Sequence, residues 1–253
     1  MSMGEQAAWV AAATGLALVV SGSALVVRDL SAGTRAHELA RRVRAVTEQA
    51  PTRQEATHED RPKQGVDLDD LRTDNPDAVA WLFVEGTAVD SPVVQASDTS
   101  RDWYLSHDFW GEPSSWGCPY LDARCSPADA VLMVYGHHVS GTHEAFSDLS
   151  DACDPAAFIG LGSCRWDTGD GNTVTLSPLC SLRVESNDGL VGSVLTWPPD
   201  DLDGLLAKLC TRAEARSTDW AQGCARAQRA LLLVTCSSFL PGQSGRTITV
   251  FCT

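Results

Sequence analysis

The stretch Leu231–Arg246, LLLVTCSSFLPGQSGR, decides the fold and directs attention to one thiol. It opens with an apolar run, Leu231–Val234, whose length and composition are typical of a fully buried strand. Cys236 lies at the C-terminal end of this run, and the loop that follows contains turn-forming Pro and Gly residues. A second run with alternating apolar residues begins at Arg246, so the stretch predicts two strands joined as a hairpin. In such a hairpin, Cys236 and Arg246 face each other at the mouth of the loop.

A thiol beside a guanidinium group is suited to nucleophilic catalysis for two reasons. The cation favours the nucleophilic thiolate over the thiol, whose reference pKa is about 8.5. The guanidinium can also bind a developing oxyanion through paired N–H donors. A buried structural cysteine is the alternative, because free Cys is among the most buried residue types. This stretch alone leaves both interpretations of Cys236 open.

Short apolar runs separated by loops continue through the chain from residue 66 to the C-terminus. A short helix is expected within Val66–Ala78, ended by Asn75-Pro76-Asp77. The strand candidates are Ala78–Val84, Val89–Val94, Leu132–Tyr135, Val174–Leu176, Leu179–Val184, Leu190–Leu195, Leu231–Thr235 and Thr247–Phe251. Many short strands with long connections indicate a mainly β fold, either a barrel or a sandwich. One amphipathic helix, Asp200–Arg216, interrupts them and directs four Leu side chains to one face, which we assign to the core.

The N-terminal part of the chain has a different character. Ala7–Val27 contains no charged residue, and its 21 residues match the roughly 20 needed to cross a bilayer as a helix. A cleaved signal peptide is the alternative, but a basic n-region is missing and the apolar run continues past the small residues Ser21–Ala24. Leu30–Ala50 predicts a juxtamembrane helix or stalk, and Pro51–Gly65 a polar linker. The expected domains are therefore the N-terminus and anchor (1–27), the helix and linker (28–65) and one large domain (66–253).

The charge of the chain is concentrated in the large domain. The formal net charge is −14, and residues 65–253 carry eleven Arg and Lys against twenty-six Asp and Glu. Such an acidic domain is a poor partner for nucleic acid, which requires a basic surface. An acidic surface suits a cationic or amine-bearing ligand, or serves solubility.

Nine cysteines lie between residues 118 and 252, and none precedes them. Because the number is odd, full pairing would leave one cysteine over. We expect Cys236 to be that one and the other eight to be largely paired, with Cys210–Cys224 as the first choice and Cys118–Cys125 as the second. Zinc is the rival interpretation, but the chain has no CxxC pair, so no metal is expected. Disulfides place the domain outside the cell. The positive-inside rule points the other way, since several Arg follow the apolar segment, but long domains translocate largely regardless of charge.

A second reactive side chain follows another apolar run. Tyr135-Gly136-His137 ends the run Val131–Val134, so His137 also lies at the C-terminal end of a predicted buried strand. Cysteine and histidine together are the arrangement of nucleophilic acyl transfer, in which the histidine acts as base and then as acid. A structural histidine is the alternative.

A series of motifs runs in order from Asp67 to Thr253. They are Asn75-Pro76-Asp77, Ala80-Trp81-Leu82, Gly86-Thr87, Asp90-Ser91-Pro92-Val93-Val94-Gln95, Tyr104-Leu105, Phe109, Gly117 to Leu121-Asp122, Tyr135-Gly136-His137, Gly141, Phe146, Leu149 and Leu233-Val234-Thr235-Cys236. Arg246 lies ten residues after Cys236. Together these motifs resemble those of the class B sortases. The resemblance implies a closed sortase-type β-barrel of about eight strands with a few helices, preceded by an N-terminal transmembrane helix and stalk.

The resemblance also implies an activity. Cys236, His137 and Arg246 would be catalytic, and Thr235 would contribute to substrate binding or the oxyanion site. The enzyme would cleave a C-terminal sorting motif of secreted proteins and transfer the acyl group to an amine of a peptidoglycan precursor, without a cofactor. It would be a single-pass protein of a Gram-positive-type cell membrane, with its catalytic domain extracellular. The alternatives are a pilin-polymerising sortase, whose acceptor is an amine of another protein, and an inactive, disulfide-stapled binding domain on the same scaffold.

Overall fold

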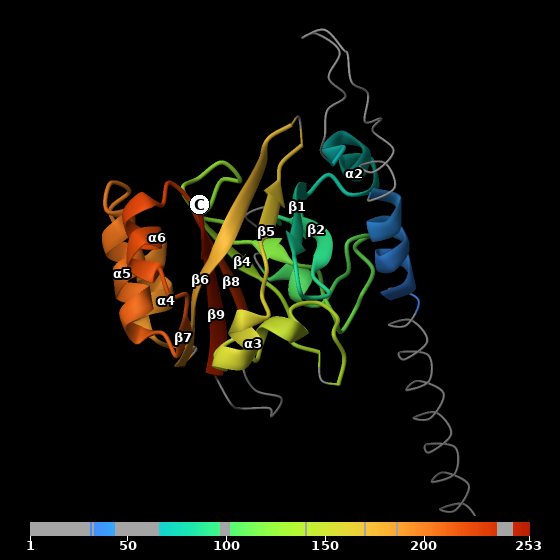
Figure 1. Ribbon diagram of the computed structural model, residues 1–253. Coiled ribbons are helices and arrows are strands. Elements are labelled where there is room, and N and C mark those ends of the chain that lie inside the picture. Colours follow the sequence, from blue (N-terminus) through green and yellow to red (C-terminus); the bar gives the residue numbers. More distant parts are fainter. Residues whose placement is uncertain are drawn as a thin grey trace, which may run out of the picture.

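The computed structural model describes residues 31, 33–43, 66–96, 102–139, 141–169, 171–185, 187–236 and 245–253 (Figure 1). The expected membrane anchor at Ala7–Val27 and the expected linker at Pro51–Gly65 lie outside these residues. Among the helices of the described residues, none combines the length and the apolar composition that a membrane span requires.

Eight strands of the described chain close into a barrel. They are β1 (Ala78–Val84), β2 (Asp90–Val94), β3 (Tyr120–Leu121), β4 (Val131–Tyr135), β5 (Cys164–Asp167), β6 (Thr173–Glu185), β8 (Ala230–Cys236) and β9 (Gly245–Cys252). Their order around the barrel is β5-β1-β2-β3-β4-β8-β9-β6, and β6 pairs again with β5. The short β7 (Ala215–Arg216) adds to the outer side of β6. The mainly β, closed barrel of about eight strands is therefore confirmed.

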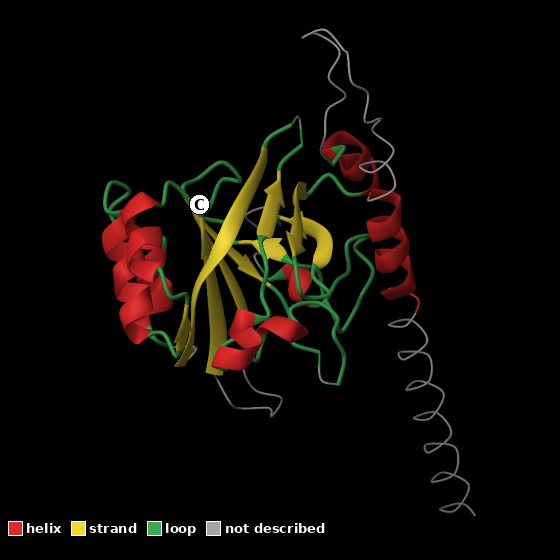
Figure 2. Ribbon diagram, in the orientation of Figure 1, coloured by secondary structure: helices red, strands yellow, loops and turns green. Residues whose placement is uncertain are grey.

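Helices lie around the barrel, as Figure 2 shows. They are α2 (Leu68–Asp74), α3 (Pro155–Ile159), α4 (Gly189–Val194), α5 (Leu202–Arg212) and α6 (Trp220–Arg226). The last three gather on one side of the barrel, where Leu205, Leu206 and Leu209 of α5 are buried in the main core. The predicted core face of the helix at Asp200–Arg216 is thus confirmed, with shorter bounds.

The hairpin of β8 and β9 has the register expected from the sequence. Leu231, Leu232 and Leu233 are completely buried, in agreement with an apolar run inside a barrel. The two strands pair antiparallel, with Ala230 opposite Cys252 and Cys236 opposite Arg246. The register matters because a slip of one residue would turn every side chain of a strand to the other face of the sheet.

Two strand predictions need correction. Leu190–Leu195 is the helix α4 and not a strand, because Asp188 accepts a hydrogen bond from the Leu190 backbone at 2.8 Å and caps it. Leu190 and Val194 then lie one turn apart, both buried, which a short apolar run does not reveal. The candidates Val174–Leu176 and Leu179–Val184 belong to one strand, β6, whose register shifts between Pro178 and Cys180.

The helical prediction before the linker is confirmed over residues 33–43, but this helix does not stand free as a stalk. Leu39 and Ala40 are buried against a second apolar cluster that includes Trp81 and Phe109. The helix therefore lies against the barrel, beside α2 (Figure 1).

The expected cysteine pairing is wrong for the eight cysteines whose side chains the structure describes. All eight are buried and carry free thiols. The Sγ atoms of Cys210 and Cys224 are 3.9 Å apart, which is a hydrogen-bond contact and not a bond. Cys118 and Cys125 lie in different apolar clusters. These residues act as small apolar side chains of the core, a role that their number and spacing did not indicate.

We predict that these eight cysteines resist alkylation in the native protein. Burial raises the pKa of the Cys125 and Cys252 thiols to about 11, and it also excludes the reagent. Iodoacetamide should leave all eight unmodified under native conditions and label all eight in guanidinium chloride without a reductant, as mapped by peptide mass spectrometry. A pair that becomes labelled only after a reductant is added would contradict the free thiols.

Candidate active site

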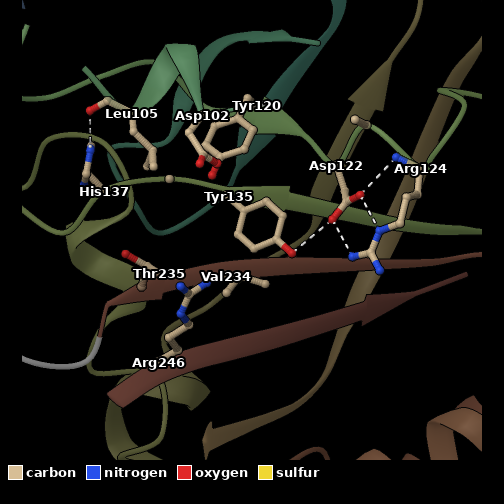
Figure 3. A pocket seen from close by; sticks show the side chains of 12 residues that line it. Asp102, Leu105, Tyr120, Asp122, Arg124, Tyr135, His137, Val234, Thr235 and Arg246 are labelled. Carbon is tan, nitrogen blue, oxygen red and sulfur yellow. Dashed lines mark hydrogen bonds and ion pairs between the residues drawn. The ribbon is translucent and has the colours of Figure 1, made fainter. Parts of the chain in front are cut away.

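A cavity of about 430 Å³ opens where β4 and β8 end (Figure 3). His137, Thr235 and Arg246 line it, together with a polar group on its far wall formed by Asp122, Arg124 and two tyrosines. Three of the residues expected at the site thus border one cavity, although His137 follows β4, Thr235 belongs to β8 and Arg246 belongs to β9.

Parallel pairing of β4 and β8 brings the histidine and the cysteine segments together. Tyr135 pairs with Val234, and the Gly136 N–H donates to the Val234 carbonyl at 3.0 Å. Because parallel neighbours end at the same edge of a sheet, His137 follows β4 beside the end of β8. Gly136 is required at this point, since a Cβ atom there would lie 2.5 Å from the Phe146 ring.

Antiparallel pairing brings in the arginine. Cys236 is the last residue of β8, and Arg246 stands directly opposite it on β9. Residues that are directly opposite in antiparallel strands are close neighbours. The Arg246 side chain borders the cavity, so a guanidinium lies next to the position of the expected nucleophile.

The histidine is held by a loop from another part of the chain. His137 Nε2 lies 2.7 Å from the backbone carbonyl oxygen of Leu105, as the dashed line in Figure 3 shows. Leu105 ends the 3-10 turn Trp103–Leu105. This contact joins residues 32 positions apart in the sequence.

The Thr235 side chain carries a buried hydroxyl group that makes no hydrogen bond to the described residues. The residue is 3% exposed, and among the described residues its Oγ1 has no hydrogen-bond partner. A buried polar group without a partner is costly and calls for an explanation. Thr235 also borders the cavity, so its buried hydroxyl lies in the wall of the candidate site.

The polar group on the far wall was missed in the sequence. Asp122 receives hydrogen bonds from Arg124 Nε at 2.9 Å and Nη2 at 2.8 Å, and from the Tyr135 hydroxyl at 3.1 Å. The Tyr135 ring stacks on Tyr120, with 5.2 Å between centroids.

The protonation states of this polar group follow from burial and hydrogen bonding. Burial raises the pKa of the Asp122 carboxyl, but the hydrogen bonds from Arg124 outweigh this effect, and the pKa is lowered overall. Burial and the Asp122 charge raise the pKa of Tyr135, so its hydroxyl stays protonated. Tyr120, Asp122 and Tyr135 occur in the motifs quoted above, but neither Arg124 nor the grouping of the four side chains was predicted from the sequence.

The two nearby histidines lie apart from the lining of the cavity. His138 forms an isolated bridge with Ala145. His143 is exposed, and its Nδ1 lies 2.6 Å from Asp148 Oδ1. Across the described residues, no group of three or more His, Cys, Asp or Glu side chains could hold a metal ion.

Comparison with known proteins points to one family. No family model matches the chain. Sortase B of Listeria monocytogenes is 29% identical over 105 residues, which are 41% of this chain and 42% of that protein. Sortase B of Staphylococcus aureus is 34% identical over 86 residues, 33% of this chain and 34% of that protein. The aligned parts span less than half of these relatives.

The structural similarity extends over most of the chain. The structure of a Staphylococcus aureus sortase B–substrate complex aligns with a TM-score of 0.71 at 19% identity, covering 89% of this chain and 97% of that one. Clostridium perfringens sortase B aligns with a TM-score of 0.62 at 24% identity, covering 73% and 97%. The chain has the class B sortase fold, and the resemblance seen in its motifs is confirmed.

We predict that His143 titrates above its ordinary pKa of 6.5, because its hydrogen bond and ion pair with Asp148 favour the imidazolium. Since the pKa is raised in the folded state, the stabilisation is complete below the unfolded pKa of about 6.5 and disappears as the pH rises through the folded value. Histidine NMR titration should show the raised pKa, and Asp148→Asn should return it toward 6.5. An unchanged pKa in this variant would refute the role of Asp148.

Proposed function

We propose that this chain is a sortase-type cysteine transpeptidase, in which Cys236 is the nucleophile, His137 the acid–base group and Arg246 the group that binds the substrate carbonyl or oxyanion. One observation carries the proposal: His137, Thr235 and Arg246 line one cavity at the end of the strand that carries Cys236. The class B sortase fold supports it, since one aligned structure is a complex of sortase B with substrate.

In the first step, the Cys236 thiolate attacks a backbone carbonyl carbon in the sorting motif of a secreted protein. The carbonyl oxygen becomes an oxyanion, which the Arg246 N–H groups can stabilise together with the Thr235 hydroxyl, for which the described residues supply no partner. The C–N bond then breaks, His137 gives a proton to the leaving amine, and a thioester remains on Cys236.

In the second step, an amine of a peptidoglycan precursor attacks the thioester. His137 takes the proton from the amine, the C–S bond breaks, and the Cys236 thiolate is regenerated. The strongly acidic charge of the domain favours an amine, which is cationic in solution, as the acceptor. We place the reaction at the outer face of the cell membrane, with the apolar segment Ala7–Val27 as the anchor.

The proposal predicts an acyl-enzyme on Cys236. The full chain, incubated with a library of peptides that carry sorting motifs, should gain the acyl mass on Cys236, and an added amine should release it as product. Cys236→Ala should abolish this, whereas the control Cys125→Ala should retain it. His137→Ala should lower the rate by about 10²–10⁴-fold, while His138→Ala and His143→Ala should stay close to wild type. Peptide binding without any acyl-enzyme would instead support an inactive binding domain.

Arg246 tests the oxyanion role separately. Lys keeps the positive charge but lacks the planar fork of the guanidinium. If Arg246 holds an oxygen by paired N–H groups, Arg246→Lys should lose nearly as much as Arg246→Ala, about 10²–10³-fold in kcat. Near-normal turnover of the Lys variant would show that only the charge is needed.

A further inference from the structure

The contact of His137 with Leu105 determines which ring nitrogen can move a proton. A carbonyl oxygen only accepts hydrogen bonds, so at 2.7 Å His137 Nε2 must carry the proton and donate it. The neutral ring then has its lone pair on Nδ1, and Nδ1 is the atom that exchanges protons in acyl transfer. The backbone carbonyl of Leu105 does here what the third member does in a catalytic triad, which is to orient the base.

The Leu105 carbonyl belongs to the loop of residues 102–118. The two ends of this loop are joined by a hydrogen bond next to His137. The Cys118 N–H donates to the Tyr104 carbonyl at 2.9 Å, which ties the two ends of the loop together. Gly117, with φ of +63°, lies against the imidazole. A Cβ atom there would be 2.5 Å from the Tyr104 oxygen and 3.0 Å from His137 Cδ2. The position of the loop therefore decides the position of the ring.

A buried carboxylate organises the middle of the same loop. Asp108 is 5% exposed, and its Oδ1 accepts from the backbone N–H groups of Trp110 and Glu112, each at 3.0 Å. Its Oδ2 accepts from Arg35 Nη2 at 3.0 Å, and the Arg35 guanidinium also lies 4.8 Å from the centroid of the Trp110 ring. A buried charge needs a partner of opposite sign, and Arg35 supplies it.

Arg35 belongs to the helix at residues 33–43, which precedes the barrel domain in the sequence. The same helix carries a second ion-pairing arginine, Arg42, whose Nη2 lies 3.3 Å from both Asp70 and Asp74 of α2. The two arginines thus attach one helix to two different parts of the domain: Arg42 pairs with α2, and Arg35 pairs with the loop that reaches His137.

We propose that Arg35 and Asp108 are positioning residues for catalysis: they hold the loop 102–118 so that the Leu105 carbonyl fixes His137 with its proton on Nε2. The helix before the barrel is then part of the acyl-transfer machinery, although it does not border the cavity. This inference rests on the proposed function for its catalytic meaning, while the histidine tautomer can be measured without activity.

The first test uses the full chain without substrate. Long-range ¹H–¹⁵N NMR of neutral His137 should show the proton on Nε2 in the wild type and in Arg42→Ala. Arg35→Ala and Asp108→Asn should give a mixture of tautomers, and Arg35→Lys, which keeps the charge but not the contact with Trp110, should lie between them. A proton on Nδ1 in the wild type, or an unchanged Nε2 tautomer in Arg35→Ala, would overturn the proposal.

The second test uses kinetics. Arg35→Ala should lower kcat by about tenfold to a hundredfold, because a small misplacement of a catalytic group has effects of this size, with KM little changed. Arg42→Ala, which loses an ion pair on the same helix, should keep the wild-type kcat, and thermal unfolding should show that both variants are folded. Equal kcat values for Arg35→Ala and Arg42→Ala would contradict the proposed link between the Arg35–Asp108 pair and His137. If the wild type itself forms no acyl-enzyme, the proposed function fails, and the NMR result still decides the tautomer.

Discussion

The parallel pairing of β4 with β8 is the constraint on which the rest of the structure depends. Its hydrogen-bonded register runs from Val131–Ala230 to Tyr135–Val234, so both strands stop at the same edge. Parallel neighbours cannot be joined by a tight turn and need a long crossover. About ninety residues of the chain, with β5, β6, β7 and four α-helices, lie between these two strands. The pairing thus brings the histidine segment and the cysteine segment to one edge of the sheet although they are far apart in the sequence.

Closure of the barrel gives this edge its rigidity. β9 pairs with β8 on one side and with β6 on the other, so Arg246 projects from a strand that is held along its length. The polar residues buried beneath are satisfied locally: Thr247 donates to the Ser150 carbonyl at 2.9 Å, and Ser181 to the Ile248 carbonyl at 3.3 Å. Against this background the Thr235 hydroxyl stands out, because within the described part of the chain it has no hydrogen-bond partner, whereas these two hydroxyl groups do.

Sequence patterns were sufficient where one strand or hairpin carries the information. The apolar run before Cys236 and the alternating run after Arg246 predict both strands and their register, and the motif order predicts the barrel. Local patterns failed where an element is short, as in the helix α4, or where it contains charged residues, as in β5. The count of cysteines could not show that eight of them fill core positions. The contact of Arg35 with Asp108 spans 73 positions of sequence, and no local pattern indicates such a pair.

A carbonyl has a specific advantage over a carboxylate as the group that orients His137. The cavity already contains the carboxylates of Asp102 and Asp122, and the domain as a whole is strongly acidic. A further carboxylate at Nε2 would stabilise the imidazolium and so hinder the return of its proton to the leaving amine. The Leu105 carbonyl selects the same tautomer without adding a charge. In the proposed mechanism, stabilisation of the thiolate then falls to Arg246, and His137 transfers protons in both directions. Stabilising the thiolate and transferring protons are thus assigned to different residues in the proposal. This division is consistent with their settings, since Arg246 lies on a strand of the barrel and His137 is held by a loop outside the barrel.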